Sequence, residues 1–259
     1  MKPLVVQEAV EAMQGRVLGR MANFSIVGVS TDSREVGPGQ MFVALRGERY
    51  DGHAFVEEAL SKGACAAVVS RVADLPEAVR QAGVLIVVDD TRQGLLRLGA
   101  YYRRQLAAQV IAVTGSNGKT TTKQMIHAVL SGERKGRCSP KSFNNEIGVP
   151  LTLLSAEGSD EYLVVELGSN CPGEIDRLAR LVRPDMAVIT GVAAAHLEGL
   201  GDIEGVAEEK MAVLGHVREG GFAAVNVDHA AVRRRLGWRA QGCTVVGFGL
   251  DERAELRAT

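Results

Sequence analysis

Short apolar runs alternate with amphipathic stretches along most of this chain, and such alternation is typical of α/β proteins. In residues 1–90 the runs are brief and glycine-containing turns separate them, which predicts a small N-terminal α/β domain. Its predicted strands are Phe24–Thr31, Met41–Leu45, Ala66–Val69 and Val84–Val88, and its predicted helices are Val5–Met13 and Ala54–Lys62.

The pattern becomes more regular in the second half of the chain. Residues 91–109 predict a linking helix, and residues 110–259 predict a central domain with a mostly parallel sheet flanked by helices. Polar residues at the carboxyl ends of parallel strands share one crevice. Here those residues are Lys119, Glu166, His196 and Asn226. The predicted strands are Val110–Val113, Tyr162–Val165, Met186–Ile189, Phe222–Val225 and Thr244–Val246.

Composition narrows the class of protein. With 259 residues, 46% hydrophobic content and a net charge of −1, the chain can bury a large core and offers no basic footprint for nucleic acid. No apolar run reaches the length of a membrane span, and the amphipathic N-terminal segment differs from a signal peptide. We expect a cytoplasmic monomer without membrane insertion, whose four scattered cysteines are free thiols.

The stretch 110–122 carries the strongest chemical signal. An apolar run, a turn with Gly115 and Gly118, and a helical segment follow one another in the order of a phosphate-binding loop. Helix amides and dipole attract the anion, and Lys119 adds a full charge. The general pattern has glycine where this chain has Val113, so an ordinary turn is the alternative. The predicted ATP-binding residues are Gly115, Ser116, Asn117, Gly118, Lys119, Thr120 and Thr121, with Thr120 or Thr121 as a magnesium ligand.

The helix after this loop is amphipathic. Met125, Ile126, Val129 and Leu130 recur at helical spacing, which predicts that they form one apolar face.

Three other residues could act beside the phosphates. Glu166 follows a predicted strand, where a carboxylate can hold magnesium or orient water, or simply face solvent. His196 can serve as a metal ligand or proton carrier, although a lone histidine is usually structural. Lys210 lies in the apolar stripe of a predicted helix, so its ammonium is paired, extends to the rim, or is chemically modified. That stripe consists of Ile203, Val206, Ala207, Lys210 and Leu214.

Further polar residues gather in loops. From the residues alone, the two segments of the first domain are equally well explained as ligand loops or as solvated turns, whereas an ordinary turn is the better explanation of the asparagine pair. They are Ser30, Thr31, Asp32, Ser33 and Arg34 after one predicted strand, Arg46 and Gly47 after the next, and the pair Asn144 and Asn145.

Several motifs resemble one family. TGSNGKTTT at 114–122 resembles the ATP loop of the Mur ligase superfamily, and STDSREVGPGQMFVALRGERYDGHAF at 30–55 resembles the N-terminal domain of its MurE and MurF members. FNNEIGVP at 143–150, ELGSNCPGEI at 166–175 and AHLEGLG at 195–201 are similar to the MurF group. Cys171 and Gly191 depart from that group, which commonly has histidine and asparagine there.

The resemblance implies a function and a set of roles. It implies an ATP- and Mg²⁺-dependent ligase that adds D-Ala-D-Ala to UDP-MurNAc-tripeptide through an acyl-phosphate in peptidoglycan precursor synthesis. Lys119, Glu166, His196 and Lys210 would be catalytic. Of these, Glu166, His196 and a carbamylated Lys210 would hold metal together with Thr120. Asn226 would lie near the ATP base, and the UDP-precursor would contact Ser30–Arg34, Arg46, Gly47, Asn144 and Asn145.

Two alternatives stay open. A MurE-like ligase is the nearest, although the Asn144–Asn145 motif favours MurF. Because family members carry a third domain for the incoming dipeptide, we also expect that this chain is truncated within the central domain. The second alternative is therefore a non-catalytic protein that binds nucleotide or UDP-precursor.

Overall fold

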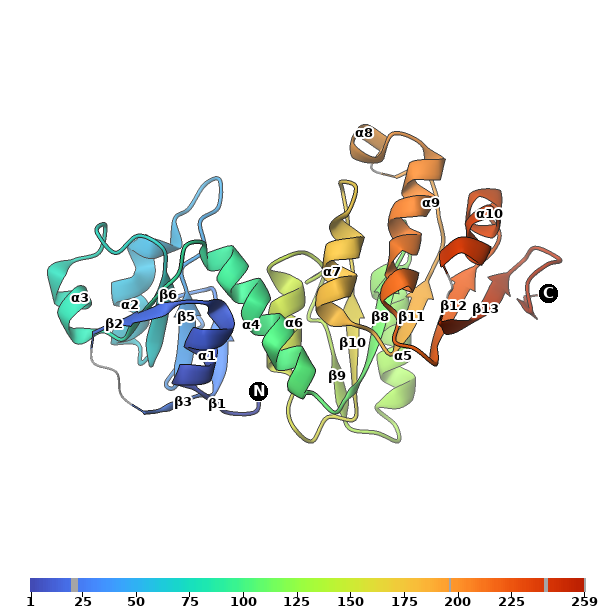
Figure 1. Cartoon of the computed structure of the whole chain (residues 1–259). Helices are drawn as coiled ribbons and strands as arrows, with labels where there is room; N and C mark the ends of the chain where they lie inside the picture. The colour runs from blue at the N-terminus through green and yellow to red at the C-terminus, as the bar shows by residue number, and fades with distance from the viewer. Residues whose placement is uncertain (20–22, 196, 240–241, 259) are drawn as a thin grey trace. The chain divides into compact units, whose positions relative to one another are not determined.

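The computed structural model describes residues 1–19, 23–195, 197–239 and 242–258, except the side chains of residues 82 and 237–239. The chain divides into two compact units (Figure 1). The first comprises Met1–Gln105 with Leu154–Gly158, and the second comprises Leu106–Leu153 with Ser159–Thr259. The predicted linking helix, observed as α4 at Thr91–Gln105, lies in the first unit.

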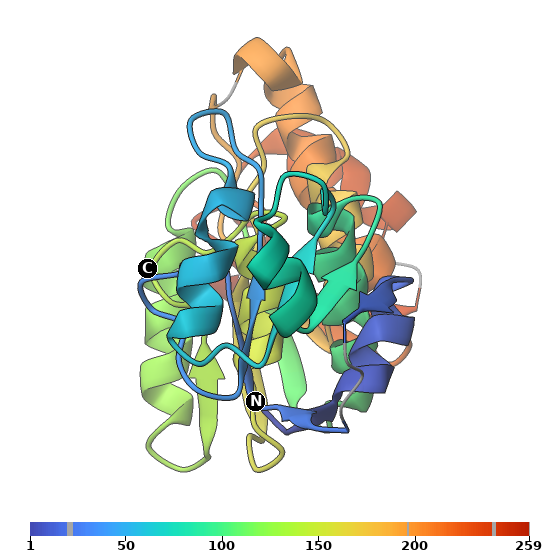
Figure 2. The same ribbon diagram turned by 90° about the vertical axis from the view of Figure 1, so that its left-hand side faces the viewer.

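The first unit is built on a five-stranded sheet with strand order β2-β7-β6-β5-β4, parallel except for β2. Helices α2 and α3 cover one face (Figure 2), where Val56 and Val79 join the core around Phe42. The strands are β1 Leu4–Val5, β2 Arg16–Leu18, β3 Ser25–Ile26, β4 Gly28–Ser30, β5 Gln40–Val43, β6 Ala66–Val69 and β7 Leu85–Val87; the helices are α1 Val6–Met13, η1 Gly52–Phe55, α2 Val56–Ser61, α3 Glu77–Ala82 and α4.

The second unit contains a seven-stranded sheet with strand order β14-β13-β12-β11-β8-β10-β9, in which every pairing is parallel. Its strands are β8 Gln109–Thr114, β9 Gly136–Cys138, β10 Tyr162–Glu166, β11 Met186–Ile189, β12 Gly221–Asn226, β13 Cys243–Gly249 and β14 Leu256–Arg257. Its helices are α5 Lys119–Leu130, α6 Gly148–Ser155, α7 Glu174–Val182, α8 Leu197–Leu200, α9 Ile203–Met211, η2 Ala212–His216 and α10 Ala230–Arg239.

The connections of this sheet create a crevice beside β8. Helix α5, which follows β8, lies on one face, whereas α7 and α9, which follow the neighbouring strands β10 and β11, lie on the other (Figure 1). A parallel sheet opens a ligand crevice where successive connections diverge in this way. The register places Glu166 beside Val113 and Ile189 beside Thr114, so the segments after three strands begin at one level.

The predicted α/β architecture is confirmed, and several elements differ from the prediction. Phe24–Thr31 forms two short strands in separate sheets, because β3 pairs with β1 and β4 pairs with β5. The predicted helix Ala54–Lys62 begins as the 3₁₀ turn η1. In α5, Ile126 and Leu130 pack on the core as expected, but Met125 and Val129 are 64% and 76% exposed. The strands β1, β2, β9 and β14 and the helix α3 were not predicted.

A groove of about 530 Å³ runs beside the exposed side of α5. It is apolar, and it lies on the sheet face that α5 covers only in part. Its lining residues include Met125, Val129, Met186, Phe222 and Phe248. Among the helices of the described residues, none combines the length and hydropathy that a membrane crossing requires.

Candidate nucleotide and magnesium site

The turn after β8 needs both of its glycines. Gly115 has φ +143° and Gly118, directly before α5, has φ +77°. These are backbone conformations that side chains with a Cβ rarely adopt. A Cβ on Gly115 would also overlap the hydroxyl of Thr190, which follows β11. The turn is therefore packed tightly against the neighbouring strand.

Side chains fix this turn to the segment after β11. The Thr190 hydroxyl lies 2.5 Å from the Asn117 carbonyl oxygen, and the Ser116 hydroxyl donates to the Ala193 carbonyl at 3.1 Å. The Ala193 amide in turn donates to the Ser116 Oγ at 3.0 Å. Residues after β11 thus fix the conformation of the turn, as a preformed phosphate-binding loop requires. Thr190 was not predicted, although its place directly after a strand signals it.

Lys119 begins α5 and folds over the turn. Its ammonium donates to the carbonyl oxygens of Gly115 at 2.8 Å and Ser116 at 3.1 Å. Burial lowers the pKa of Lys119, and the negative charge of Glu166 partly opposes that shift. Because the first amides of a helix have no partner within it, the start of α5 presents donors and a cation at one point.

Three side chains meet at the carboxylate of Glu166, the last residue of β10. Thr120 donates to Oε2 at 2.9 Å, and Asn144 donates to Oε1 at 2.9 Å. The ammonium of Lys123 lies 3.3 Å from Oε2, and Lys123 and Glu166 are 0% and 1% exposed as side chains. The structure thus brings together the predicted residues Lys119, Thr120, Glu166 and Asn144. Lys123 was missed, although it lies one helical turn after Lys119.

Asn144 and Asn145 have different roles. Whereas Asn144 contacts Glu166, the Asn145 side chain accepts the amides of Ile147 at 3.1 Å and Gly148 at 2.9 Å, and so caps the start of α6. The loop is further tied to β10 by the Ser139 hydroxyl, which accepts the Glu166 amide at 2.9 Å. Loop residues 139–145 therefore position Glu166, in addition to any contact they could make with a ligand.

The donor set fits a magnesium ion that is bound together with phosphate. No group of three His, Cys, Asp or Glu residues within the described part of the chain could hold a metal by itself. Mg²⁺ usually takes one or two carboxylates and completes its shell with phosphate oxygens and water. The Glu166 carboxylate and the Thr120 hydroxyl beside the loop provide such a partial set.

Lys210 on α9 is buried, with 1% exposure, so it does not reach the rim of its helix. Its ammonium donates to the Ser169 hydroxyl at 2.7 Å. Burial, and to a smaller extent the charge of Lys119, lower the pKa of Lys210 to about 8, which places both lysines in one electrostatic environment. A pKa near 8 leaves an appreciable neutral fraction at physiological pH.

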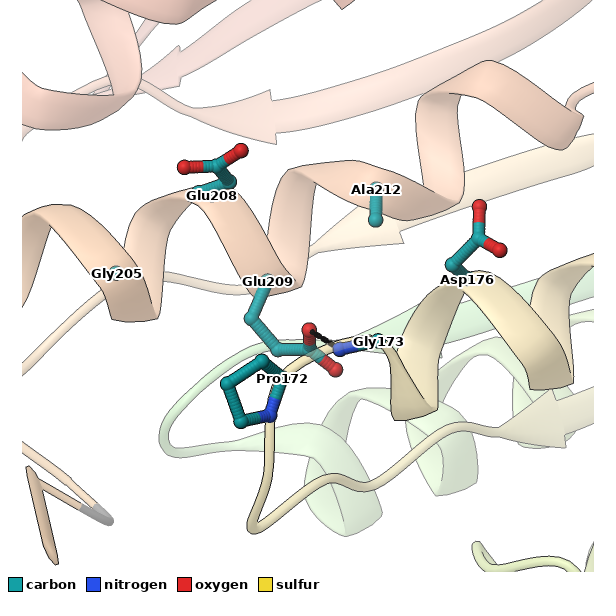
Figure 3. Close-up of a pocket in the computed structure, with 7 residues that line it drawn as sticks. All are labelled: Pro172, Gly173, Asp176, Gly205, Glu208, Glu209 and Ala212. Atoms are coloured by element: carbon teal, nitrogen blue, oxygen red, sulfur yellow. Dashed lines mark hydrogen bonds between the residues drawn. The ribbon is translucent and has the colours of Figure 1, made fainter. Parts of the chain in front are cut away.

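The neighbouring Glu209 anchors the same loop. Its carboxylate accepts the amides of Gly173 and Ile175, each at 2.7 Å, at the start of α7 (Figure 3). Negative charge at a helix start is stabilising. Figure 3 also shows Glu208 on α9 pointing away from this contact. Consecutive residues of α9 therefore hold the loop between β10 and α7 at two points.

Two predicted residues of the described part, Asn226 and Thr121, are not brought to this cluster. Asn226 ends β12, which is separated from β8 by β11, and its amide oxygen accepts the Asp228 amide at 2.9 Å. His196 lies outside the described residues. Thr121, the second candidate hydroxyl, is exposed on α5.

The predicted substrate residues of the first unit gather at one sheet edge. The parallel strands β4 and β5 end at Ser30 and Val43, so the segments Thr31–Arg34 and Arg46–Gly47 follow the same edge. Arg34 pairs with Asp32 and lowers the pKa of that carboxyl to about 2. The Ser33 hydroxyl donates to Glu58 at 2.9 Å.

Arg46 closes a turn through a β-bridge to Asp51. Asp51 in turn contacts the Nδ1 of His53 at 2.7 Å, and the His53 Nε2 accepts the Ser70 amide at 2.9 Å. The bond to Nε2 assigns the ring proton to Nδ1. His53 was not predicted as a site residue, although the motif that includes it was noted. It fixes this turn rather than facing open solvent, because it is 5% exposed.

Comparisons with known proteins agree with this geometry. The "Mur ligase middle domain" family model matches residues 113–259, and the "Mur ligase family, catalytic domain" model matches residues 25–103. The UDP-N-acetylmuramoyl-tripeptide--D-alanyl-D-alanine ligase of Bacillus subtilis is 41% identical over 222 residues, which cover 84% of this chain and 48% of that protein. This chain spans about half the length of the curated relatives it matches.

Two solved structures are similar over most of the chain. MurF from Acinetobacter baumannii has a TM-score of 0.89 at 35% identity and covers 100% of this chain, which covers 56% of it. MurF from Thermotoga maritima, solved in complex with ADP, has a TM-score of 0.75 at 32% identity, with coverage of 86% and 50%. On these matches, and on the phosphate loop and the sheet that carries it, this chain belongs to the Mur ligase family.

Proposed function

We propose that this chain forms the nucleotide- and UDP-precursor-binding parts of an ATP-dependent ligase that joins D-Ala-D-Ala to UDP-MurNAc-tripeptide. The observation that carries the proposal is that Lys119, Thr120 and Glu166 lie together beside the glycine-containing turn after β8. The similarity to MurF ligases supports the choice of substrates. Since ATP and UDP-linked precursors are cytoplasmic metabolites, the reaction belongs to the cytoplasm.

The phosphate loop would bind the tail of ATP. Lys119 would exchange the carbonyl oxygens of Gly115 and Ser116 for phosphate oxygens, while the first amides of α5 donate to the same anion. The hydrogen bonds of Ser116 and Thr190 would keep the turn from moving as the ligand enters. Asn226 would contribute near the base, at the end of β12.

Glu166 and Thr120 would hold a Mg²⁺ ion, whose charge would offset that of the phosphates during transfer. A carboxylate oxygen of the tripeptide would attack the terminal phosphorus and release ADP, which gives an acyl-phosphate. The amine of D-Ala-D-Ala would then attack the acyl carbon, and phosphate would leave as the amide forms. Positioning and charge stabilisation by Lys119 would supply much of the rate.

Lys210 would be carbamylated, as the resemblance to Mur ligases implies. Its lowered pKa and its burial favour the neutral amine that reacts with carbon dioxide. The new carboxylate would face the charge of Lys119 and could hold a second Mg²⁺ with His196. The Ser169 hydroxyl, now bonded to the amine, would hold the modified group in place.

The first unit would bind the UDP part of the precursor along the edge where β4 and β5 end. Ser30–Arg34, Arg46 and Gly47 would contribute, with Arg46 and Arg34 as partners for the pyrophosphate. Asn144 and Asn145 would lie toward the peptide, Asn144 through the contact it already makes with Glu166.

Titration calorimetry tests the nucleotide part. The chain should bind a non-hydrolysable ATP analogue with Mg²⁺, and Lys119→Ala should weaken that binding about tenfold or more, because a charge-assisted bond contributes roughly 1.5–3 kcal/mol. Equal affinities for the two proteins would overturn the assignment of Lys119. Separate titrations with UDP-MurNAc-tripeptide and UDP-MurNAc-dipeptide test the precursor, and preference for the dipeptide would favour a MurE-like ligase.

A further inference from the structure

Lys123 is a buried cation in a position where the proposed function requires a metal ion. Its side chain is 0% exposed and lies 3.3 Å from the Glu166 Oε2 atom, on the carboxylate that Thr120 also contacts. The ammonium donates a second bond to the carbonyl oxygen of Lys141. It therefore has partners on two sides, and close packing prevents it from swinging into solvent.

The loop that Lys123 contacts is itself held firmly. Lys141 has φ +45°, an unusual conformation for a residue with a Cβ, and the Gly168 amide donates to the Asn144 carbonyl at 2.8 Å. A Cβ on Gly168 would overlap the Asn144 side chain. Loop 139–144 and β10 therefore fix the position of the Lys123 charge relative to the Glu166 carboxylate.

The charges of this cluster do not favour a free divalent cation. Two ammonium groups, Lys119 and Lys123, act on the single carboxylate of Glu166. Lys210 lies in the same field as Lys119, and the carboxylates of Glu209 and Glu174 partly offset the charge of Lys210. A dication that approached Glu166 alone would meet net positive charge at short range, where a low dielectric makes repulsion strong. A nucleotide tail reverses the sign, because it brings several negative charges to the loop.

We propose that Lys123 is a positioning residue that makes metal binding at Glu166 depend on the nucleotide. It neutralises the buried carboxylate in the free protein and repels Mg²⁺ until phosphate oxygens are present. The inference rests on the proposed function, and it adds an order of events, in which nucleotide and metal enter together rather than metal first.

Removing the charge of Lys123 should strengthen metal binding, whereas structural damage to the site would weaken it. Lys123→Met keeps the length and apolar stem of the side chain but leaves Glu166 without its counter-charge. In titrations with Mn²⁺ alone, followed by electron paramagnetic resonance, this variant should bind the metal at least roughly tenfold more tightly than the wild-type chain. A merely structural lysine would predict weaker binding or none, because loss of a support loosens the site.

Three controls complete the experiment. Lys123→Arg keeps the charge and should retain weak binding of Mn²⁺ alone. Lys123→Met with Glu166→Gln removes both charges, so it should fold better than Lys123→Met and should lose the gained metal binding. In calorimetry, the factor by which Mg²⁺ increases the affinity for the ATP analogue should be smaller in Lys123→Met than in the wild-type chain.

The outcomes separate this inference from the proposed function. If the wild-type chain binds the ATP analogue with Mg²⁺ but Lys123→Met shows no gain in Mn²⁺ affinity, the role of Lys123 is wrong while the function stands. If Lys123→Met does not fold, Lys123→Gln replaces it in the same Mn²⁺ titration, because the amide removes the charge but can still donate to the Lys141 carbonyl. A gain in Mn²⁺ affinity over the wild-type chain supports the proposal, and no gain contradicts it. If the wild-type chain does not bind the ATP analogue with Mg²⁺, the proposed function itself is wrong.

Discussion

The hydroxyl of Thr120 donates its proton to the Oε2 atom of Glu166 at 2.9 Å. The oxygen lone pairs of the hydroxyl therefore stay available to a cation, and the first turn of α5 is joined to the end of β10. The residues alone left Thr120 or Thr121 as a metal ligand, and the resemblance pointed to Thr120. Among the hydrogen bonds of the described residues, only Thr120 of the two makes this contact.

The two threonines should consequently behave differently. Thr120→Val should weaken the Mg²⁺-dependent binding of an ATP analogue about tenfold, since a bond to a charged group is worth roughly 1.5–3 kcal/mol. Thr121→Val, a matched change on an exposed position of the same helix, should alter the affinity less than about twofold. Calorimetry with and without Mg²⁺ measures both, and equal losses would remove Thr120 from the metal site.

Lys210 should make stability depend on pH in a defined direction. Its pKa is about 8 in the folded chain against 10.5 for an ordinary lysine. Below pH 8 the buried charge costs its full penalty, and the penalty falls as the pH rises from about 8 to 10.5, because the folded chain releases the proton first. Lys210→Met should therefore stabilise the fold below pH 8, by about 1–4 kcal/mol.

Urea unfolding at several pH values, in buffer free of bicarbonate, measures this difference. The advantage of Lys210→Met should shrink toward pH 10.5. A constant difference across the range would contradict the lowered pKa. Carbon-13 NMR with labelled bicarbonate tests carbamylation separately, where a carbamate signal that disappears in Lys210→Met is expected.

Glu209 should contribute to stability through two backbone amides. Glu209→Ala leaves the part-buried amide of Gly173 and the buried amide of Ile175 without their acceptor, so the free energy of unfolding should fall by roughly 2–4 kcal/mol. Glu209→Gln keeps one acceptor oxygen, so its free energy of unfolding should lie between those of Glu209→Ala and the wild type. Glu208→Ala, on the adjacent exposed residue, is the control and should change stability far less. Similar losses for Glu208 and Glu209 would refute the capping role.

Gly115→Ala should damage the phosphate loop. The added Cβ would overlap the Thr190 hydroxyl and force alanine to φ +143°, a strain of about 1–3 kcal/mol. We expect loss of nucleotide binding together with a lower midpoint in urea. Gly132→Ala is a suitable control, because the nearest atom to a Cβ there is 3.6 Å away. An unaffected Gly115→Ala would show that the turn has room to adjust.

The strands of the second unit were predictable because both of their faces carry apolar residues, and the central strands β8 and β10 are buried on both faces. Tyr162–Val165 and Met186–Ile189 appear in the sequence as continuous apolar runs, and turn residues mark their ends. The convergence of Lys119 and Glu166 followed from the rule that parallel strands end at one edge. For the same reason, the rule could have included Thr190.

What could not be predicted depends on partners distant in sequence. Periodicity in α5 favours Val129 over Lys123 as a buried residue, yet Lys123 is buried because Glu166 and the Lys141 carbonyl satisfy its ammonium. Val129 is exposed because the sheet beside it is covered only in part. Asn145 presents the same problem, since only the start of α6 shows that it is a helix cap.

The adjacent contacts of Glu209 and Lys210 have a mechanical consequence. Neighbouring residues of a helix point about 100° apart, so the loop at Ser169–Gly173 must wrap around α9 to reach both. A rotation or a one-residue slip of α9 would detach the carboxylate and the ammonium together. A displacement of Lys210 would therefore also displace the beginning of α7, and the packing of α7 would restrict that displacement.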